Sequence, residues 1–223
     1  MTLLVVSLSL VWGCLAFRGN ELEPVESLPV VDGEGVKPSV SIAWEHRYAF
    51  RGKEEEGRGN PGDELPKIDQ VELLEVLRQS SYFSTVFGAN DYLTPEEQES
   101  IDLAMSVKLV RLDSEAARIA DVLIGGLTAY VIPFWTTRSY RVDSRVEKAS
   151  GEVYEYQIED SVTEAYWIPF GIVAPFFTPI HQMASDIRKN IYRTLLVRMQ
   201  QDGLFVASVP ELEAGETSRR FAD

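Results

Sequence analysis

The sequence predicts an α+β fold, with helices packed on one face of a mixed or antiparallel sheet. The first observation is an alternation of apolar and charged residues on both sides of a short turn, which predicts a long charged β-hairpin over about 137–163. The second is helical periodicity in two separate segments. The third is the order of predicted elements, which is strand, helix, strand, helix, hairpin, helix, strand. With 223 residues, 45% of them hydrophobic, the chain can bury a core.

Local patterns predict the elements that precede the hairpin. SVSIAWEHRYAF (39–50) alternates as a strand does, and an acidic loop over 51–66 follows it. Apolar residues recur at helical spacing within 67–83. Thr94, followed by a proline and two glutamates, is typical of a helix start. Two further segments have the composition of strands, FSTVFG (83–88) and AMSVKLVRL (104–112).

The register of the predicted hairpin follows from its charges. Closing the turn with Lys148 opposite Glu152 places opposite charges on one face and apolar side chains on the other. A shift of one residue would mix the two faces. The other predicted pairs are Arg145 with Glu155, Arg141 with Glu159, Val146 with Tyr154, Val142 with Ile158, Phe134 with Tyr166, and Trp135 with Ala165.

The last predicted helix begins after Thr178 and Pro179 and ends near Gly203. We expect the basic side chains on this helix, among them Arg188, to be solvated. LFVAS (204–208) predicts a final strand.

The chain opens with an apolar segment that ends at its only cysteine, Cys14. LLVVSLSLVW (3–12) has the length of a signal-peptide core and is too short to span a membrane. VWGC (11–14) resembles a bacterial lipobox, whose cysteine carries lipid. The proline-, glycine- and acid-rich segment that follows is typical of a flexible tether. The alternative is a buried N-terminal strand with Cys14 in the core. The predicted organisation is a signal peptide over 1–13, a lipid-anchored tether over 14–38, one α+β domain over 39–208 and a disordered tail over 209–223.

Two further apolar segments, 119–135 and 165–177, are interrupted by glycine, proline or charge, which disfavours simple membrane spans. The predicted hairpin register brings their ends together as one aromatic–proline cluster. Its members are Pro133, Phe134, Trp135, Tyr166, Trp167, Pro169 and Phe170. The cluster is either a core contact or an exposed patch for lipid or a partner, because aromatic side chains suit a membrane interface.

Composition and motifs disfavour several classes of function. The net charge of −14 repels phosphate backbones, so we expect no nucleic-acid partner. A GxGxxG spacing within 57–62 contains a proline and lies outside any predicted strand–turn–helix unit, so it predicts no nucleotide site. The sequence lacks the common catalytic motifs, and of its two histidines His46 is expected at the surface and His181 packed or solvated. We therefore predict no catalytic residue, no metal site and no cofactor.

Residues 67–203 resemble a group of uncharacterised bacterial lipoproteins through LLEVLRQSSYFSTV, GGLTAYVIPFW, YRVDSRVEKASGEVYEYQIEDSV, WIPF and LVRMQQDGLF. The helix ending in SSYFSTV is also similar to the N-terminal α/β domain of the Tol-system periplasmic translocation protein and to the curli-secretion lipoprotein. These resemblances imply an interaction or assembly role in the cell envelope, and they carry over no catalytic residues.

We therefore expect a non-catalytic, lipid-anchored protein of the bacterial cell envelope. Leu15, rather than aspartate, follows Cys14, which in lipoproteins resembling those of enterobacteria favours the outer membrane, with the domain facing the periplasm. The expected partners are the membrane, through lipid on Cys14, and another envelope protein or a second copy of the chain. One alternative is a membrane-embedded protein that uses 119–135 and 165–177, and a less favoured one is an enzyme of unknown type.

Overall fold

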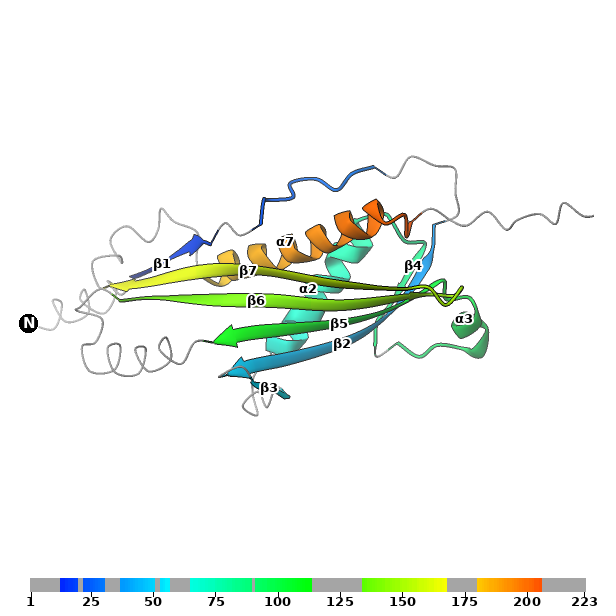
Figure 1. The fold of residues 1–223 in the computed structure, drawn as a ribbon, viewed down its shortest axis with the longest axis horizontal. Coiled ribbons are helices and arrows are strands. Elements are labelled where there is room, and N and C mark those ends of the chain that lie inside the picture. The colour runs from blue at the N-terminus through cyan, green and yellow to red at the C-terminus, as the bar shows by residue number, and fades with distance from the viewer. Residues whose placement is uncertain are drawn as a thin grey trace, which may run out of the picture.

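A computed structural model places the described elements in one mixed sheet with helices beside it (Figure 1). The residues that the structure describes are 13–19, 22–30, 37–50, 53–56, 65–89, 91–113, 134–167 and 180–205. The strands are β1 (Gly13–Arg18), β2 (Ser39–Phe50), β3 (Lys53–Glu56), β4 (Thr85–Phe87), β5 (Leu103–Asp113), β6 (Phe134–Lys148) and β7 (Val153–Trp167). The helices are α2 (Leu65–Gln79), α3 (Pro95–Glu99) and α7 (Ile180–Gln201).

The strand order in the sheet is β1-β7-β6-β5-β2-β3, and β4 pairs with the beginning of β2. β2 runs parallel to both β5 and β4, whereas the other neighbouring strands are antiparallel. The sheet is therefore mixed, and with its helices it confirms the α+β class predicted from the sequence.

β6 and β7 form an antiparallel pair closed by a tight turn. The Lys148 N–H donates to the Glu152 carbonyl at 2.9 Å, and the Gly151 N–H donates to the Lys148 carbonyl at 2.8 Å. Gly151 adopts a φ of 88°, a conformation that glycine tolerates best. The observed register contains the six pairs predicted from the sequence, which are Arg145–Glu155, Arg141–Glu159, Val146–Tyr154, Val142–Ile158, Phe134–Tyr166 and Trp135–Ala165.

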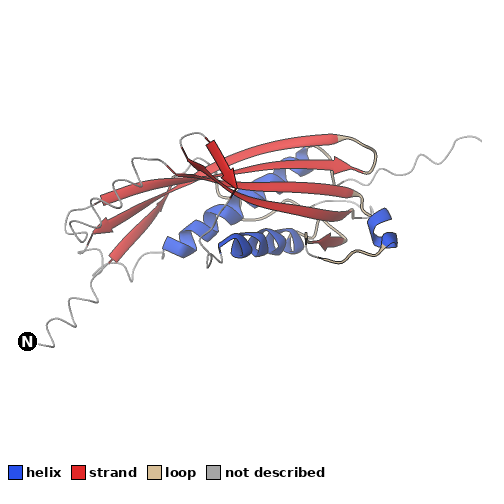
Figure 2. Cartoon of the chain, turned by 90° about the horizontal axis from the view of Figure 1, so that it is seen from below, coloured by secondary structure: helices blue, strands red, loops and turns tan. Residues whose placement is uncertain are grey.

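The core lies between the sheet and the two long helices, which Figure 2 shows on the same side of the strands. In β6 and β7, alternate residues are buried toward the helices, as the pleat of a β-strand requires. We call this side of the sheet the inner face and the opposite side the outer face. The largest fully buried side chains include Ile42, Leu73, Leu77, Met105, Leu109, Ile158, Ile187, Ile191, Tyr192 and Leu195. None of the described helices is both long enough and apolar enough to cross a membrane.

Two predicted elements differ from the structure. The helix predicted over 67–83 ends at Gln79, because the Ser80 hydroxyl donates to the Leu77 carbonyl and Ser81 follows with a φ of 58°. Residues 204–205 form a turn after α7 instead of the predicted strand, and 206–208 lie outside the described residues. Phe205 is buried at this turn, where its ring packs 4.6 Å from the ring of Tyr82. Leu204 is buried as well, so both apolar side chains of this turn reach the core without a partner strand.

The N-terminal part of the chain also differs from the predicted tether. Residues 13–18 form β1, which pairs with β7, and residues 22–30 make hydrogen bonds with α7. The described parts of 14–38 are therefore docked on the domain. Backbone pairing with β7 and the burial of Ala16 account for the docking of β1. The described fold accordingly includes residues on the N-terminal side of the predicted domain boundary at 39.

Candidate functional site

Cys14 lies in the edge strand β1, opposite Tyr166 of β7. Gly13, the first residue of β1, lies opposite Trp167, the last residue of β7. Phe134, the first residue of β6, lies on the other side of Tyr166. The start of β1, the start of β6 and the end of β7 therefore meet at one end of the sheet, opposite to the hairpin turn (Figure 1). The backbone of Cys14 thus lies in a strand, whereas its side chain is outside the described part of the structure. We call this region the Cys14 end.

Phe134 and Tyr166 pack together on the inner face at the Cys14 end. Their ring centroids are 6.1 Å apart and their planes are inclined by 19°, so the rings are stacked. Phe134 is only 6% exposed. This part of the predicted cluster therefore belongs to the interior of the molecule.

Trp135 points to the outer face and is 68% exposed. Phe17, two strands away, lies on the same face with 46% of its surface exposed. Between them lie Thr137 and Thr163, whose hydroxyl oxygens are 3.0 Å apart. The outer face at the Cys14 end therefore carries two exposed aromatic side chains with neutral neighbours, and we call this the aromatic patch.

The predicted aromatic–proline cluster is thus divided between two faces of the sheet. Successive residues of a strand point in opposite directions, so Phe134 and Trp135 cannot share a face. Only the backbone of Trp167 is described, and Pro133, Pro169 and Phe170 lie outside the described residues, as does most of 119–135 and 165–177. Phe17 was missed because its strand was predicted as a tether.

Charged side chains lie on the inner face close to the Cys14 end. Arg138 Nη2 is 3.1 Å from Glu164 Oε2, and the Tyr166 hydroxyl also donates to Glu164. Arg18 Nε lies 3.8 Å from Asp160 Oδ2. Glu164 and Asp160 are almost completely buried. Burial of these carboxylates would be costly without nearby opposite charges, so the pairs hold β1, β6 and β7 in one arrangement.

The sequence contained a signal for these buried charges. In the predicted register, residues 138, 160 and 164 fall on the same face as Val142 and Ile158, which is the apolar face. Charged residues on a core face require partners.

A second buried network joins β2, α2 and α7. Arg188 donates from Nε and Nη2 to the two oxygens of Glu72, at 2.8 and 3.0 Å, and Ser185 donates to the same carboxylate at 2.7 Å. Arg188 Nε is also 3.0 Å from Asp69 Oδ1. His46 Nδ1 lies 3.9 Å from Asp69 Oδ2, and both side chains are buried. The expectations of a solvated Arg188 and a surface His46 are therefore wrong, because both side chains point into the polar layer between sheet and helices. His181 lies in α7, but its side chain is outside the described residues.

Burial in this network shifts the pKa values of several of its members. Burial raises the pKa of Asp69 to about 6, against the opposing effect of the Arg188 charge. Burial works to lower the pKa of Arg188, but the hydrogen bond with Glu72 and the charge of Asp69 outweigh it and leave the pKa above its usual value. Burial also raises the pKa of Tyr192, whose hydroxyl makes no hydrogen bond within the described part of the chain.

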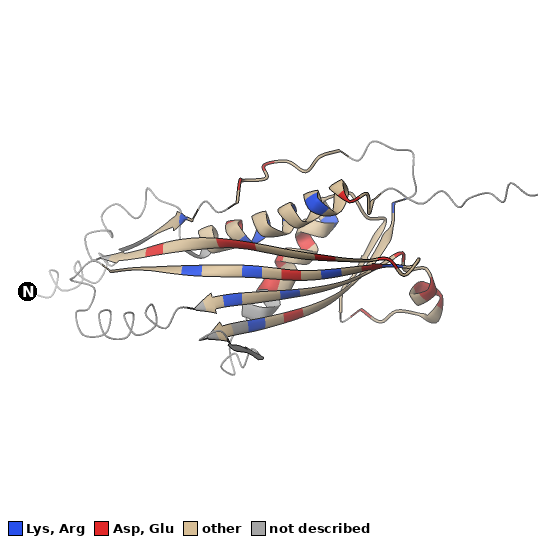
Figure 3. Ribbon diagram, viewed as in Figure 1, with Lys and Arg blue, Asp and Glu red and all other residues tan. Residues whose placement is uncertain are grey.

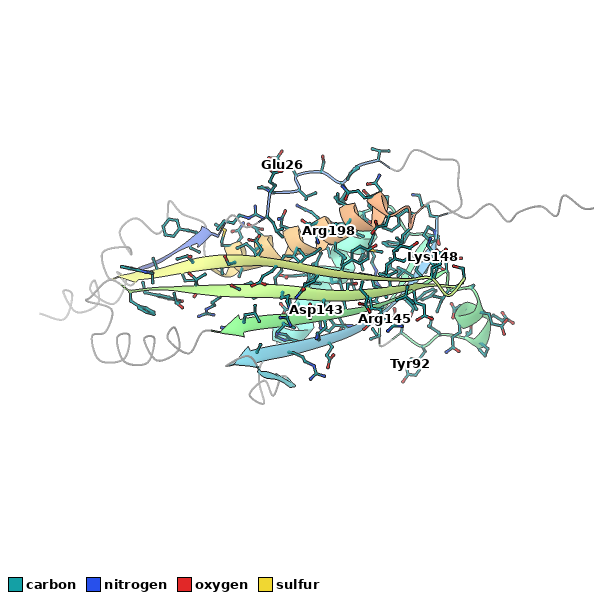
Figure 4. All side chains as sticks on the ribbon, viewed as in Figure 1. Glu26, Tyr92, Asp143, Arg145, Lys148 and Arg198 are labelled. Carbon is teal, nitrogen blue, oxygen red and sulfur yellow. The ribbon has the colours of Figure 1, made fainter. Side chains whose placement is uncertain are left out.

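The outer face beyond the aromatic patch is polar, with basic and acidic residues along its strands (Figure 3). Asp143 lies 3.2 Å from Lys108 and 3.1 Å from Arg141, and Arg145 lies 3.9 Å from Glu147. Asp143 and Arg145 are labelled in Figure 4. Over the described residues, no three His, Cys, Asp or Glu side chains are grouped so that they could hold a metal ion.

Comparisons with known proteins found no matching family model and no matching curated protein. Among solved structures, the chain is similar to the PelC dodecamer from Paraburkholderia phytofirmans, with 8% identity, a TM-score of 0.34, and coverage of 84% of this chain and 97% of that chain. It is also similar to a structure described as a neuraminyllactose-binding hemagglutinin homolog from Helicobacter pylori, with 14% identity, a TM-score of 0.38, and coverage of 81% and 91%. Similarity at this level does not define a family for the chain.

Proposed function

We propose that this chain is a non-catalytic, lipid-anchored protein of the bacterial cell envelope, acylated on Cys14, whose folded body binds a partner at the membrane surface. The observation that carries the proposal is the position of Cys14 at the same end of the sheet as the exposed side chain of Trp135.

A lipid on Cys14 would hold the Cys14 end of the sheet against the bilayer. Tryptophan side chains suit the level of the lipid headgroups because they combine a large apolar ring with an N–H donor. Phe17, three residues after Cys14, would add apolar area beside Trp135. The segment 119–135 contains the start of β6 and the segment 165–177 contains the end of β7, so both include residues at this same end.

The outer face of the hairpin supplies the surface for the partner. With the helices packed on the inner face, the charged side chains of the hairpin remain accessible, among them Arg145, Glu155 and Glu159. Such a surface suits another envelope protein or a second copy of this chain, because complementary charges set the specificity of protein pairs. The resemblance to bacterial lipoproteins supports the same location, at the outer membrane and facing the periplasm.

Fatty-acid labelling tests the anchor directly. Cells expressing the full chain or the Cys14→Ala variant are grown with a labelled fatty acid and separated into membrane and soluble fractions. Since Cys14 is the only cysteine, we expect the label on the wild type to be lost completely in the variant, together with most of its membrane association.

A wild-type chain that carries no label contradicts the proposal. Membrane association of an unlabelled Cys14→Ala chain would instead favour the membrane-embedded alternative through 119–135 and 165–177.

A further inference from the structure

Residues 22–30 form an extended strap that lies along α7 (Figure 1). Leu22 and Leu28 pack against the hydrophobic core from outside. The strap is also held by hydrogen bonds from side chains of α7 and from Tyr82. It therefore has a defined binding site on the domain surface.

Each of these hydrogen bonds is made to a backbone atom of the strap. The Asn190 amide accepts from the Val25 N–H at 2.7 Å and donates to the Glu23 carbonyl at 3.2 Å. Arg193 donates to the Val25 carbonyl at 3.3 Å, and the Tyr82 hydroxyl donates to the Pro29 carbonyl. Because backbone groups are common to every peptide, this arrangement selects an extended conformation more than a particular sequence.

The side chains that face the domain recur every third residue. Leu22, Val25 and Leu28 are half-buried, whereas the residues between them are exposed, including Glu26, which is labelled in Figure 4. A period of three is that of the polyproline II helix, and Pro24 and Pro29 fit such a segment. Docking of a preformed, extended, proline-containing segment loses little conformational entropy, which is a recurring mode of peptide recognition.

Asn190 is the central residue of the site. It is only 4% exposed with the strap in place, and its amide makes two hydrogen bonds to the strap backbone. Departure of the strap would open this amide to water and remove both hydrogen bonds. A second extended peptide that docks here could make the same two hydrogen bonds.

We propose that this surface of α7, with Tyr82, is a binding site for an extended proline-containing peptide, and that its occupant in trans is the strap of a second copy of this chain. The strap is the one peptide whose fit to the site is known in detail. Its contacts depend on nothing outside residues 22–30, so the same segment of a second molecule can make all of them. This inference is independent of the lipid anchor.

The test uses the full chain with its own strap weakened by Leu22→Ser and Leu28→Ser, and a fluorescent peptide with the sequence of residues 20–32 as the probe. We expect anisotropy to report binding to this strap variant at least about tenfold tighter than to the wild type. The wild-type strap competes at an effective concentration in the mM range because it is attached to the site. The matched control is the same peptide with serine at both leucine positions, which should not bind.

Tyr82→Phe in the strap variant tests the site itself, because it removes one hydroxyl and retains the ring against Phe205. Loss of one hydrogen bond worth about 1 kcal/mol should weaken the peptide about fivefold. Asn190→Ala should weaken it further, since two hydrogen bonds are lost.

Sedimentation tests the second copy as the occupant. The strap variant retains the site, and an Asn190→Ala chain retains the strap, so their mixture should form a dimer that neither forms alone. The proposal is overturned if the peptide fails to bind a strap variant that has a native circular dichroism spectrum. It is also overturned if neither Tyr82→Phe nor Asn190→Ala changes the affinity of the peptide. A mixture that stays monomeric while the peptide binds overturns the second copy as the occupant.

Discussion

Asp69 is the side chain through which pH acts most directly on the described fold. It faces His46 of β2 and Arg188 of α7, and Glu72 and Arg111 add their charges to its surroundings. Tyr140 and Tyr192 border the same polar layer through their interactions with Arg188. Burial dominates and favours the neutral carboxyl group, so the folded state binds a proton at Asp69 more tightly than the unfolded state does.

The Asp69→Asn variant should therefore change how stability depends on pH. The pKa of Asp69 rises from 3.8 to about 6 on folding. The corresponding stability is present below pH 3.8 and is lost as the pH rises through about 6, a change of about 3 kcal/mol. Between pH 4 and 8 the unfolding free energy of the wild type should fall relative to that of Asp69→Asn by up to this amount, as measured by urea denaturation.

Glu75→Gln is the matched control for this experiment, because Glu75 is an exposed acid on the same helix. Its hydrogen bond with Lys189 lowers its pKa, so any stability that it contributes is lost as the pH falls, which is opposite to the effect of Asp69. Glu75→Gln should therefore not reproduce the change expected for Asp69→Asn. Parallel profiles for Asp69→Asn and the wild type would show that Asp69 titrates normally in the folded protein.

The sequence could locate some of these residues but not their partners. The hairpin register alone places Arg138 and Glu164 on the core face, because side-chain direction alternates strictly along a strand. Asp69, Glu72 and His46 carry no such signal. Their meeting depends on how α2 and α7 lie on the sheet, which local patterns do not specify.

At the scale of elements, the hairpin turn depends on one backbone conformation. Gly151 has a φ of 88°, and a methyl group added there would touch nothing within 4 Å. The cost of Gly151→Ala is therefore a backbone cost alone, and we expect a loss of about 1 kcal/mol in unfolding free energy. Urea denaturation measures it, and Ser150→Ala in the same turn is the control that should change little. Equal stability of both variants would contradict this role for Gly151.

The elements that could be predicted are those defined by neighbours in sequence. Opposite charges and a glycine turn were sufficient to define the register of β6 and β7, because a wrong register mixes the two faces. The strand β1 and the strap could not be found in this way. Their partners, β7 and α7, are distant in sequence, and their proline- and acid-rich surroundings favour a tether when only local composition is considered.

At the scale of the whole molecule, the aromatic patch gives the domain one end that differs from the rest of its surface. In a Cys14→Ala background, which removes the proposed anchor, the full chain should bind weakly to phosphatidylcholine vesicles. Trp135→Ala should lower this binding about tenfold, because an aromatic side chain that leaves water contributes at least about 1.5 kcal/mol. Co-sedimentation with the vesicles measures the partition coefficient.

Tyr92→Ala is the control for Trp135→Ala. Tyr92 is a fully exposed aromatic residue, but it lies just before α3, away from the Cys14 end (Figure 4). Its removal should leave vesicle binding unchanged. If both variants lose binding equally, the interaction with lipid is a general property of exposed aromatic residues and does not orient the domain.

The pairing of β1 with β7 and of the strap with α7 has a consequence for the order of folding. Val25 and Asn190 are separated by 165 positions in a chain of 223 residues, so the contact between them closes a very long loop. Contacts over such distances form slowly, because the entropy of loop closure is lost before the contact stabilises anything. A ribosome makes these N-terminal residues first, yet they can reach their places only after the hairpin and α7 have been synthesised. We therefore expect β1 and the strap to reach their places after the hairpin and α7 have formed.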